Sequence, residues 1–291
     1  MRIHAKPKLP LSLFLIILLL PLTIPQALAR EKPHIRFGVL SIAPPARIYA
    51  KWQPFADYMS QQLGQSVEIV VPRGFAKLKK TIEAGGVDFF YTNSLVFYRL
   101  KQAGQVQAVA QMKNIEGKTT SRSELFVRRD SGIEDVADLK GKSIAYVSPM
   151  GAGGYLAPRA LMYKSGVKSG IETNEKFTKN LSNSLHGVLL GDYAAGTMCG
   201  VNYNLMSRKI ETGELKIIAV SDEYPENVMG ARKKLPAKLV ENFKQGVLSM
   251  KDNPQGLKVL RDMRSMKIDS FVKYDAAMEK ITEQLLATGK L

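Results

Sequence analysis

One glycine-rich turn in this chain has the residue types that could hold a ligand through the backbone. It follows a β-rich run over 143–147 and precedes apolar residues at helical spacing. A turn that opens a helix leaves backbone N–H groups without acceptors, and such groups attract anions. The turn matches neither the P-loop nor the GxGxxG pattern, so it predicts an anion cradle and gives no support for a nucleotide site. The predicted cradle consists of Gly151, Ala152, Gly153, Gly154 and Tyr155.

Polar side chains follow two further predicted strands, at the point where each strand ends. We expect these side chains to complete the ligand site, because ligands of open α/β sheets bind outside the carboxyl ends of the strands. The alternative is that they only cap helices, as Ser, Thr and Asn commonly do. The candidates are Tyr91, Thr92, Asn93 and Ser94 after one strand, and Asn202 and Tyr203 after the other.

Residues for catalysis or metal binding are sparse. Cys199 is the one cysteine, and it is either a cleft residue that meets a soft ligand or a buried apolar residue. His186 lies in an apolar helical pattern, and Asp130 lies in a turn, so neither predicts acid or base chemistry. With three histidines in all and no paired nucleophile and base, we expect no enzyme activity, no metal and no cofactor.

The N-terminus predicts export. Basic residues precede an apolar run over 9–22, and Ala27-Leu28-Ala29 follows, which is the pattern of a signal peptide over 1–29. An uncleaved anchor is the alternative. Cleavage removes three basic residues and no acidic ones, so the formal charge of +16 falls to +13. This charge suits anionic solutes. The basic residues are spread along the chain without interleaved aromatics, so we expect no nucleic acid partner.

Two α/β series are needed to position these candidates. The first alternates strands and helices over 35–112, the polar segment 113–123 interrupts it, and the second runs over 125–220. Such alternation predicts mostly parallel sheets flanked by helices. From Ser221 onward the sequence reads as mostly helical, and we expect this tail to return to the first lobe. The predicted organisation is a signal peptide over 1–29, one lobe over 30–122 and 221–291, a second lobe over 123–220, and a hinge between the lobes.

The chain also resembles a known family. The stretches that carry the resemblance include WQPFADYM, GGVDFFYTNS, DSGIEDVADLKGKSIAYVSPMGAGGYLAPRALM. They are similar to the phosphate, phosphite and phosphonate family of periplasmic solute-binding proteins, which have the two-lobed type II fold. The resemblance implies a periplasmic monomer that binds a small anion and docks on an ABC permease. Relatives that bind phosphonates usually place Ser-Thr-Ser where this chain has Gly151-Ala152-Gly153, so phosphonate specificity is not carried over.

Two further functions remain open at this stage. A sensory protein would use the same closed form to contact a histidine kinase or a cyclase, and the sequence does not separate it from a transport protein. An enzyme would require a nucleophile with a base beside it, and the sequence shows no such pair.

Overall fold

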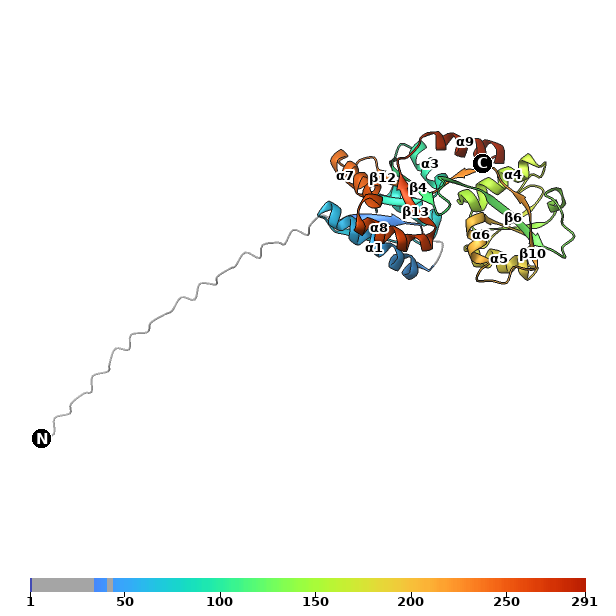
Figure 1. Ribbon diagram of the computed structural model, residues 1–291, viewed down its shortest axis with the longest axis horizontal. Coiled ribbons are helices and arrows are strands. Elements are labelled where there is room, and N and C mark those ends of the chain that lie inside the picture. Colours follow the sequence, from blue (N-terminus) through green and yellow to red (C-terminus); the bar gives the residue numbers. More distant parts are fainter. Residues whose placement is uncertain (2–33, 41–43) are drawn as a thin grey trace. The chain divides into compact units, whose positions relative to one another are not determined.

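The computed structural model describes residue 1, residues 34–40 and residues 44–291. The predicted signal peptide over 1–29 therefore lies, apart from Met1, outside the described residues. Contacts group residues 32–291 into one compact unit, which holds two separate sheets with their helices (Figure 1). We call the part built on the six-stranded sheet the first lobe and the part built on the five-stranded sheet the second lobe.

The first lobe has the strand order β13-β4-β12-β3-β1-β2. Its strands are β1 (Ile35–Val39), β2 (Val67–Val70), β3 (Phe89–Thr92), β4 (Val106–Asn114), β12 (Val228–Arg232) and β13 (Ile268–Val272). Its helices are α1 (Pro45–Leu63), α2 (Phe75–Glu83), α3 (Ser94–Gln102), α7 (Ala237–Leu248) and α8 (Pro254–Met263), with the short turns η3 (Ser249–Asp252) and η4 (Arg264–Met266).

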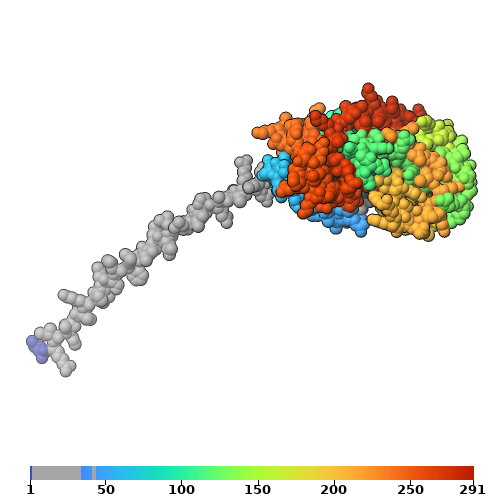
Figure 2. Space-filling view, in the orientation of Figure 1, coloured from blue at the N-terminus to red at the C-terminus, as the bar shows by residue number. Residues whose placement is uncertain are grey.

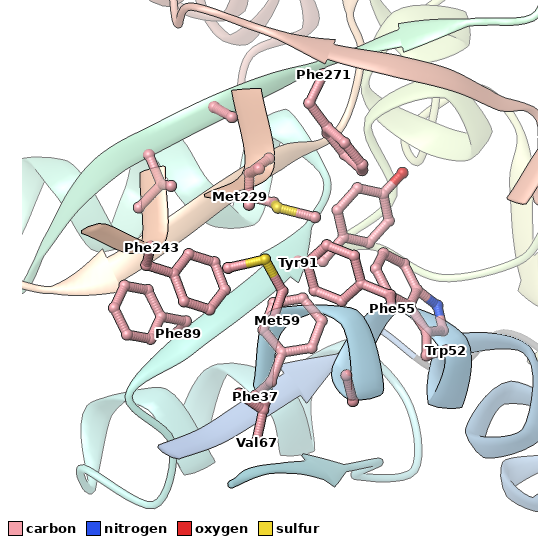
Figure 3. Packing of buried hydrophobic residues seen from close by; sticks show 14 of the residues in the cluster. Phe37, Trp52, Phe55, Met59, Val67, Phe89, Tyr91, Met229, Phe243 and Phe271 are labelled. Atoms are coloured by element: carbon pink, nitrogen blue, oxygen red, sulfur yellow. The ribbon is translucent and has the colours of Figure 1, made fainter. Parts of the chain in front are cut away.

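Side chains of β3 alternate between two apolar clusters, as the period of a strand requires. Phe89 and Tyr91 face the cluster that α1, α7 and α8 cover, whereas Phe90 faces the cluster under α2 and α3. In the first cluster Phe89 stacks on Phe243 with 3.8 Å between ring centroids, and Trp52 lies 4.8 Å from Tyr91 (Figure 3). Helices α7 and α8, coloured orange to red, lie against the blue start of the lobe (Figure 2).

The second lobe has the strand order β10-β6-β9-β7-β8. Its strands are β6 (Ser123–Arg128), β7 (Ser143–Tyr146), β8 (Asn174–Phe177), β9 (Ala195–Cys199) and β10 (Leu215–Val220). Its helices and turns are η1 (Ala137–Leu139), η2 (Ala152–Leu156), α4 (Ala157–Lys164), α5 (Leu181–Leu189) and α6 (Gly200–Met206). The last helix, α9 (Ala277–Gly289), packs against both α3 and α4 and so contacts both lobes (Figure 1).

Two short strands pair where the chain passes between the lobes. β5 (Thr120–Ser121) runs toward the second lobe and β11 (Tyr224–Pro225) runs back, and the two form an antiparallel pair. This pair is the only connection by strands between the two sheets among the described residues. We call it the crossing ribbon.

Two expectations about the sheets need correction. Each sheet is mixed, not mostly parallel: β1 pairs in parallel with β2 and β3, but β12 and β13 pair in antiparallel fashion. The tail after Ser221 is also less helical than predicted, because β12 and β13 lie within it. The two differences are linked, because β12 and β13 lie in this tail and supply the antiparallel pairs of the first sheet.

Candidate ligand-binding site

The turn after β3 faces the glycine turn of the second lobe. Asn93 caps α3 by accepting a hydrogen bond from the Val96 amide at 2.9 Å, and its Nδ2 donates to the Met150 carbonyl at 2.9 Å. Ser94 Oγ donates to the Pro225 carbonyl at 2.8 Å. Thr92 is fully buried, and its hydroxyl has no partner among the described residues. Asn93 and Ser94 of the predicted site therefore have structural hydrogen bonds. The Thr92 hydroxyl has none in the described chain.

Tyr91 is the next-to-last residue of β3, and its side chain lies in the aromatic cluster. Its hydroxyl donates to Met112 Sδ at 2.7 Å and accepts from Asn227 Nδ2 at 3.0 Å. Burial, followed by the charge of Glu226, raises the pKa of Tyr91 well above its ordinary value. The neutral phenol therefore joins β3 to the segment that follows the crossing ribbon.

The glycine turn forms a π-helical turn, η2, directly before α4. Ser123 Oγ donates to the Gly153 carbonyl, and Thr197 Oγ1 donates to the Gly154 carbonyl at 2.9 Å. A Cβ on Gly153 would lie 2.1 Å from the Tyr224 hydroxyl, so only glycine fits against the crossing ribbon. The carbonyls are thus fixed by β6 and β9, while the first amides have no acceptor within their own helix. π-turns of this kind are frequent at functional sites.

Of the three tyrosines predicted for the site, Tyr155 and Tyr203 point into the second lobe. The Tyr155 hydroxyl donates to Glu175 Oε2 at 3.1 Å, and Arg159 donates to it at 3.2 Å. Burial, and then the charge of Glu175, raises the pKa of Tyr155 to about 12. Tyr203 is buried against Phe126, with 5.3 Å between ring centroids. Residue 155 therefore contributes only its backbone to the predicted anion cradle, because its side chain bonds Glu175. Asn202, on the same helix as Tyr203, is half-buried.

Lys267 belongs to the polar residues of this region, and sequence reasoning missed it. It precedes β13 with a left-handed backbone (φ +69°), and its carbonyl accepts from the Ile115 amide at 3.1 Å. Its ammonium is buried and has no hydrogen-bond partner among the described residues. Burial lowers the pKa of Lys267 to about 8, against the opposing influence of Cys199 and Glu226, which lie close enough to act on it.

Glu226, the first residue after the crossing ribbon, is a buried carboxylate. Ser121 Oγ and Asn114 Nδ2 both donate to its Oε1, the latter at 3.1 Å. These donors come from β5 and from the end of β4, so the carboxylate joins the two passing segments. The sequence carried no signal for this cluster beyond the residue types, because its members come from four distant segments.

Basic side chains from both lobes approach one another. Burial, and then the positive charges of Lys209 and Arg47, lowers the pKa of Lys51. Arg47 and Lys51 lie on the first turns of α1, whereas Lys209 follows α6 in the second lobe. Lys51 Nζ donates to the Ser265 carbonyl at 3.4 Å. Like charges that face each other across two lobes create a positive field that attracts anions.

A groove of about 200 Å³ lies beside the crossing ribbon. Lys118 and Ser121 line it from one side, and Gly200 and Asn204 of α6 line it from the other. Glu124 also faces it, and its Oε2 is buried without a partner in the described chain. Burial, and then the charge of Glu116, raises the pKa of Glu124. The groove places polar groups of both lobes around one space.

Within the described ranges, no group of three or more His, Cys, Asp or Glu residues could hold a metal ion. No helix in that part of the chain is long and apolar enough to cross a membrane.

Two α/β lobes joined by a paired ribbon, with polar groups between them, define a periplasmic binding protein of the type II fold. Residues 37–278 match the family described as "ABC transporter, phosphonate, periplasmic substrate-binding protein". The chain belongs to this family, as the resemblance in its motifs predicted.

Curated relatives are about a quarter identical to the chain over the stretches that align. The tetrathionate sensor histidine kinase TtrS of Salmonella typhimurium is 28% identical over 145 residues, which is 48% of this chain and 24% of that protein. The phosphate-import protein PhnD of Mycolicibacterium smegmatis is 27% identical over 210 residues, 67% of this chain and 65% of that protein. The chain thus spans less than two thirds of the length of either relative.

A solved structure supports the fold. A binding protein component of an ABC phosphonate transporter from Pseudomonas aeruginosa has a TM-score of 0.76 and 20% identity, covering 89% of this chain and 87% of that chain. Identity at this level supports the fold alone.

Proposed function

We propose that this chain is the solute-binding component of an ABC importer, and that its two lobes close on a small anion. Membership of the family supports a periplasmic substrate-binding protein. The solute and the membrane partner of this chain are the part that we propose. The anionic solute is supported by the lowered pKa of Lys51, on which the positive charge of Lys209 in the opposite lobe acts after burial, followed by that of Arg47. Like charges oppose closure of an empty cleft, and an anion between them removes that opposition. Anion binding then favours the closed state over the open one.

Closure requires that the lobes move as units about the crossing ribbon. We propose that residues 30–122 and 221–291 move as the first lobe and residues 123–220 as the second. The paired β5 and β11 suit a hinge because a few residues at the ends of elements absorb the rotation. The closed form is read by an inner-membrane permease, and the binding protein acts as a monomer without enzyme activity. We propose that the signal peptide over 1–29 directs export and is then cleaved, which mass spectrometry of the mature protein would test.

Small-angle X-ray scattering and calorimetry test the function. Ligand-free protein, prepared by unfolding and refolding, is titrated with phosphate, methylphosphonate and thiosulfate. We expect at least one anion to bind and to reduce the radius of gyration. Lys209→Ala should weaken that binding by about threefold to tenfold, whereas Lys234→Ala, which removes an exposed charge elsewhere, should not. If no anion bound or altered the scattering, the proposal would be wrong.

A sensor is the second candidate function. The 28% identity to part of a sensor histidine kinase favours it, although the match covers 48% of this chain. In a sensor, the closed form would contact a histidine kinase or a cyclase in place of a permease. Crosslinking the closed protein in cell envelopes, followed by mass spectrometry of the captured partner, separates the two functions. Capture of a permease supports transport, and capture of a kinase or cyclase supports sensing.

A further inference from the structure

The groove beside the crossing ribbon has more room than a phosphate-sized ion needs. Its volume is about 200 Å³. One water occupies about 10 to 15 Å³ of such a space, so the groove can hold a solute of roughly ten non-hydrogen atoms. Residues of the segment that leaves the first lobe line one side, and residues of β6 and α6 in the second lobe line the other. A solute in this groove therefore contacts both sides of the hinge.

Two of the charged side chains in the groove are already paired with each other. Arg122 Nε lies 3.7 Å from Glu223 Oε1, and Thr120 Oγ1 donates to Glu223 Oε2 at 2.9 Å. The remaining charged side chains that line the groove form no ion pair within the described chain. Two carboxylates and one ammonium are thus available to a solute. They belong to Glu116, Glu124 and Lys118.

Glu124 is the carboxylate that most lacks a donor. Its side chain lines the groove, and its Oε2 is buried with no hydrogen-bond partner among the described residues. A Cβ on Gly200 would lie 2.9 Å from Glu124 Oε1, so the other oxygen lies against the first residue of α6. Burial, and then the charge of Glu116, raises the pKa of Glu124, as expected for two carboxylates without a cation between them. A buried carboxylate oxygen without a donor is costly, so this position favours a ligand that donates to it.

We propose that Glu124 forms a cation subsite of the cleft, and that the solute is a small organic anion that also carries a protonated amino group. This inference rests on the proposed anion-binding function. Glu124 accepts hydrogen bonds from the ammonium, and Glu116 adds to the negative field around it. Lys118 attracts the anionic end of the same solute from the other side of the groove. One solute thus joins the segment that leaves the first lobe to β6 of the second lobe, which favours the closed state.

Calorimetry with matched pairs of solutes tests the subsite. Refolded, ligand-free protein is titrated with β-alanine and propionate, with taurine and ethanesulfonate, and with phosphate, at one pH and ionic strength. Within each pair the anionic group is the same, and only one member carries an ammonium. We expect the amino member of at least one pair to bind at least about tenfold more tightly than its partner.

Glu124→Gln should bring the affinities of the two members of that pair to within about twofold, because it removes the charge of the acceptor and keeps its shape. Binding of the amino-free member should change less than about threefold. Gly200→Ala is a second route to the same result, since its Cβ would displace the Glu124 carboxylate. Glu211→Gln is the matched control, because it removes an exposed carboxylate of the same lobe that does not line the groove. It should leave the preference for the amino member unchanged.

An amino member that bound no more tightly than its partner, or a preference that survived in Glu124→Gln, would overturn the subsite. If Glu124→Gln did not fold, Gly200→Ala would decide in its place. If phosphate or the amino-free anions closed the lobes and an amino group brought no gain, the importer function would stand and the subsite would be wrong. If none of these solutes bound, the importer function itself would fail.

Discussion

Replacing Lys267 with methionine should stabilise the ligand-free protein. Methionine has nearly the same length and shape as the lysine stem, so it fills the space without bringing a charge into it. The wild-type ammonium is buried without a hydrogen-bond partner, and its desolvation opposes folding. The substitution removes that opposition.

The size of the effect follows from the proton affinity of Lys267. Its pKa falls from 10.5 to about 8 on folding. At about 1.4 kcal/mol for each pKa unit, the charged form costs about 3 kcal/mol at most, so we expect a gain of about 1 to 3 kcal/mol at pH 7. Because the folded pKa is the lower one, the cost is complete below pH 8. It disappears as the folded protein loses its proton first, between pH 8 and about 10.5.

Urea unfolding of the wild type, Lys267→Met and the control Lys273→Met, which removes an exposed lysine just beyond β13, checks this at pH 7 and at pH 10. The difference in free energy of unfolding between the wild type and Lys267→Met should be large at pH 7 and small at pH 10. Lys273→Met should match the wild type at both pH values. A Lys267→Met protein that is less stable than the wild type at pH 7, or a gap that does not change with pH, would refute the reasoning.

Three other substitutions test the surroundings of the cleft. Gly153→Ala should lower the free energy of unfolding by about 1 to 3 kcal/mol, because its Cβ would meet the Tyr224 hydroxyl at 2.1 Å; adding Tyr224→Phe should recover part of that loss in urea unfolding. Thr92→Val removes a buried hydroxyl without a partner, so calorimetry should show weaker anion binding while thermal unfolding stays the same or rises slightly. Arg159→Met breaks the buried ion pair with Glu175 and should destabilise the protein by about 3 to 5 kcal/mol in the same unfolding assay.

Local elements of the fold were predictable from the sequence. The strands and helices expected over 35–112 and 125–220 are observed, as β1 to β4 and β6 to β10 with the helices between them. Such elements are predictable where a short periodic pattern has a clear end signal. In α1, that signal is Gly64, whose left-handed backbone ends the helix. Strands β12 and β13 were missed, because each has five residues and pairs only with strands more than 100 residues away.

The sequence predicted which turns lie together at the site, but it did not predict where their side chains point. The glycine turn and Asn93 do meet, through the Met150 carbonyl. The direction of Tyr155 could not be foreseen, because η2 is a π-helical turn and its wider turn changes which face the following side chains occupy. Tyr155 therefore points to Glu175 in the interior of the second lobe.

The two unpredicted strands also position two buried charged groups near the segments that join the lobes. Glu226 lies two residues before β12, and Lys267 lies directly before β13. Each side chain thus stands at the end of a strand that is anchored in the first lobe, close to the ribbon about which the lobes would rotate. An anion that contacts residues of both lobes binds most strongly in the closed state, which is the condition for a solute to drive closure.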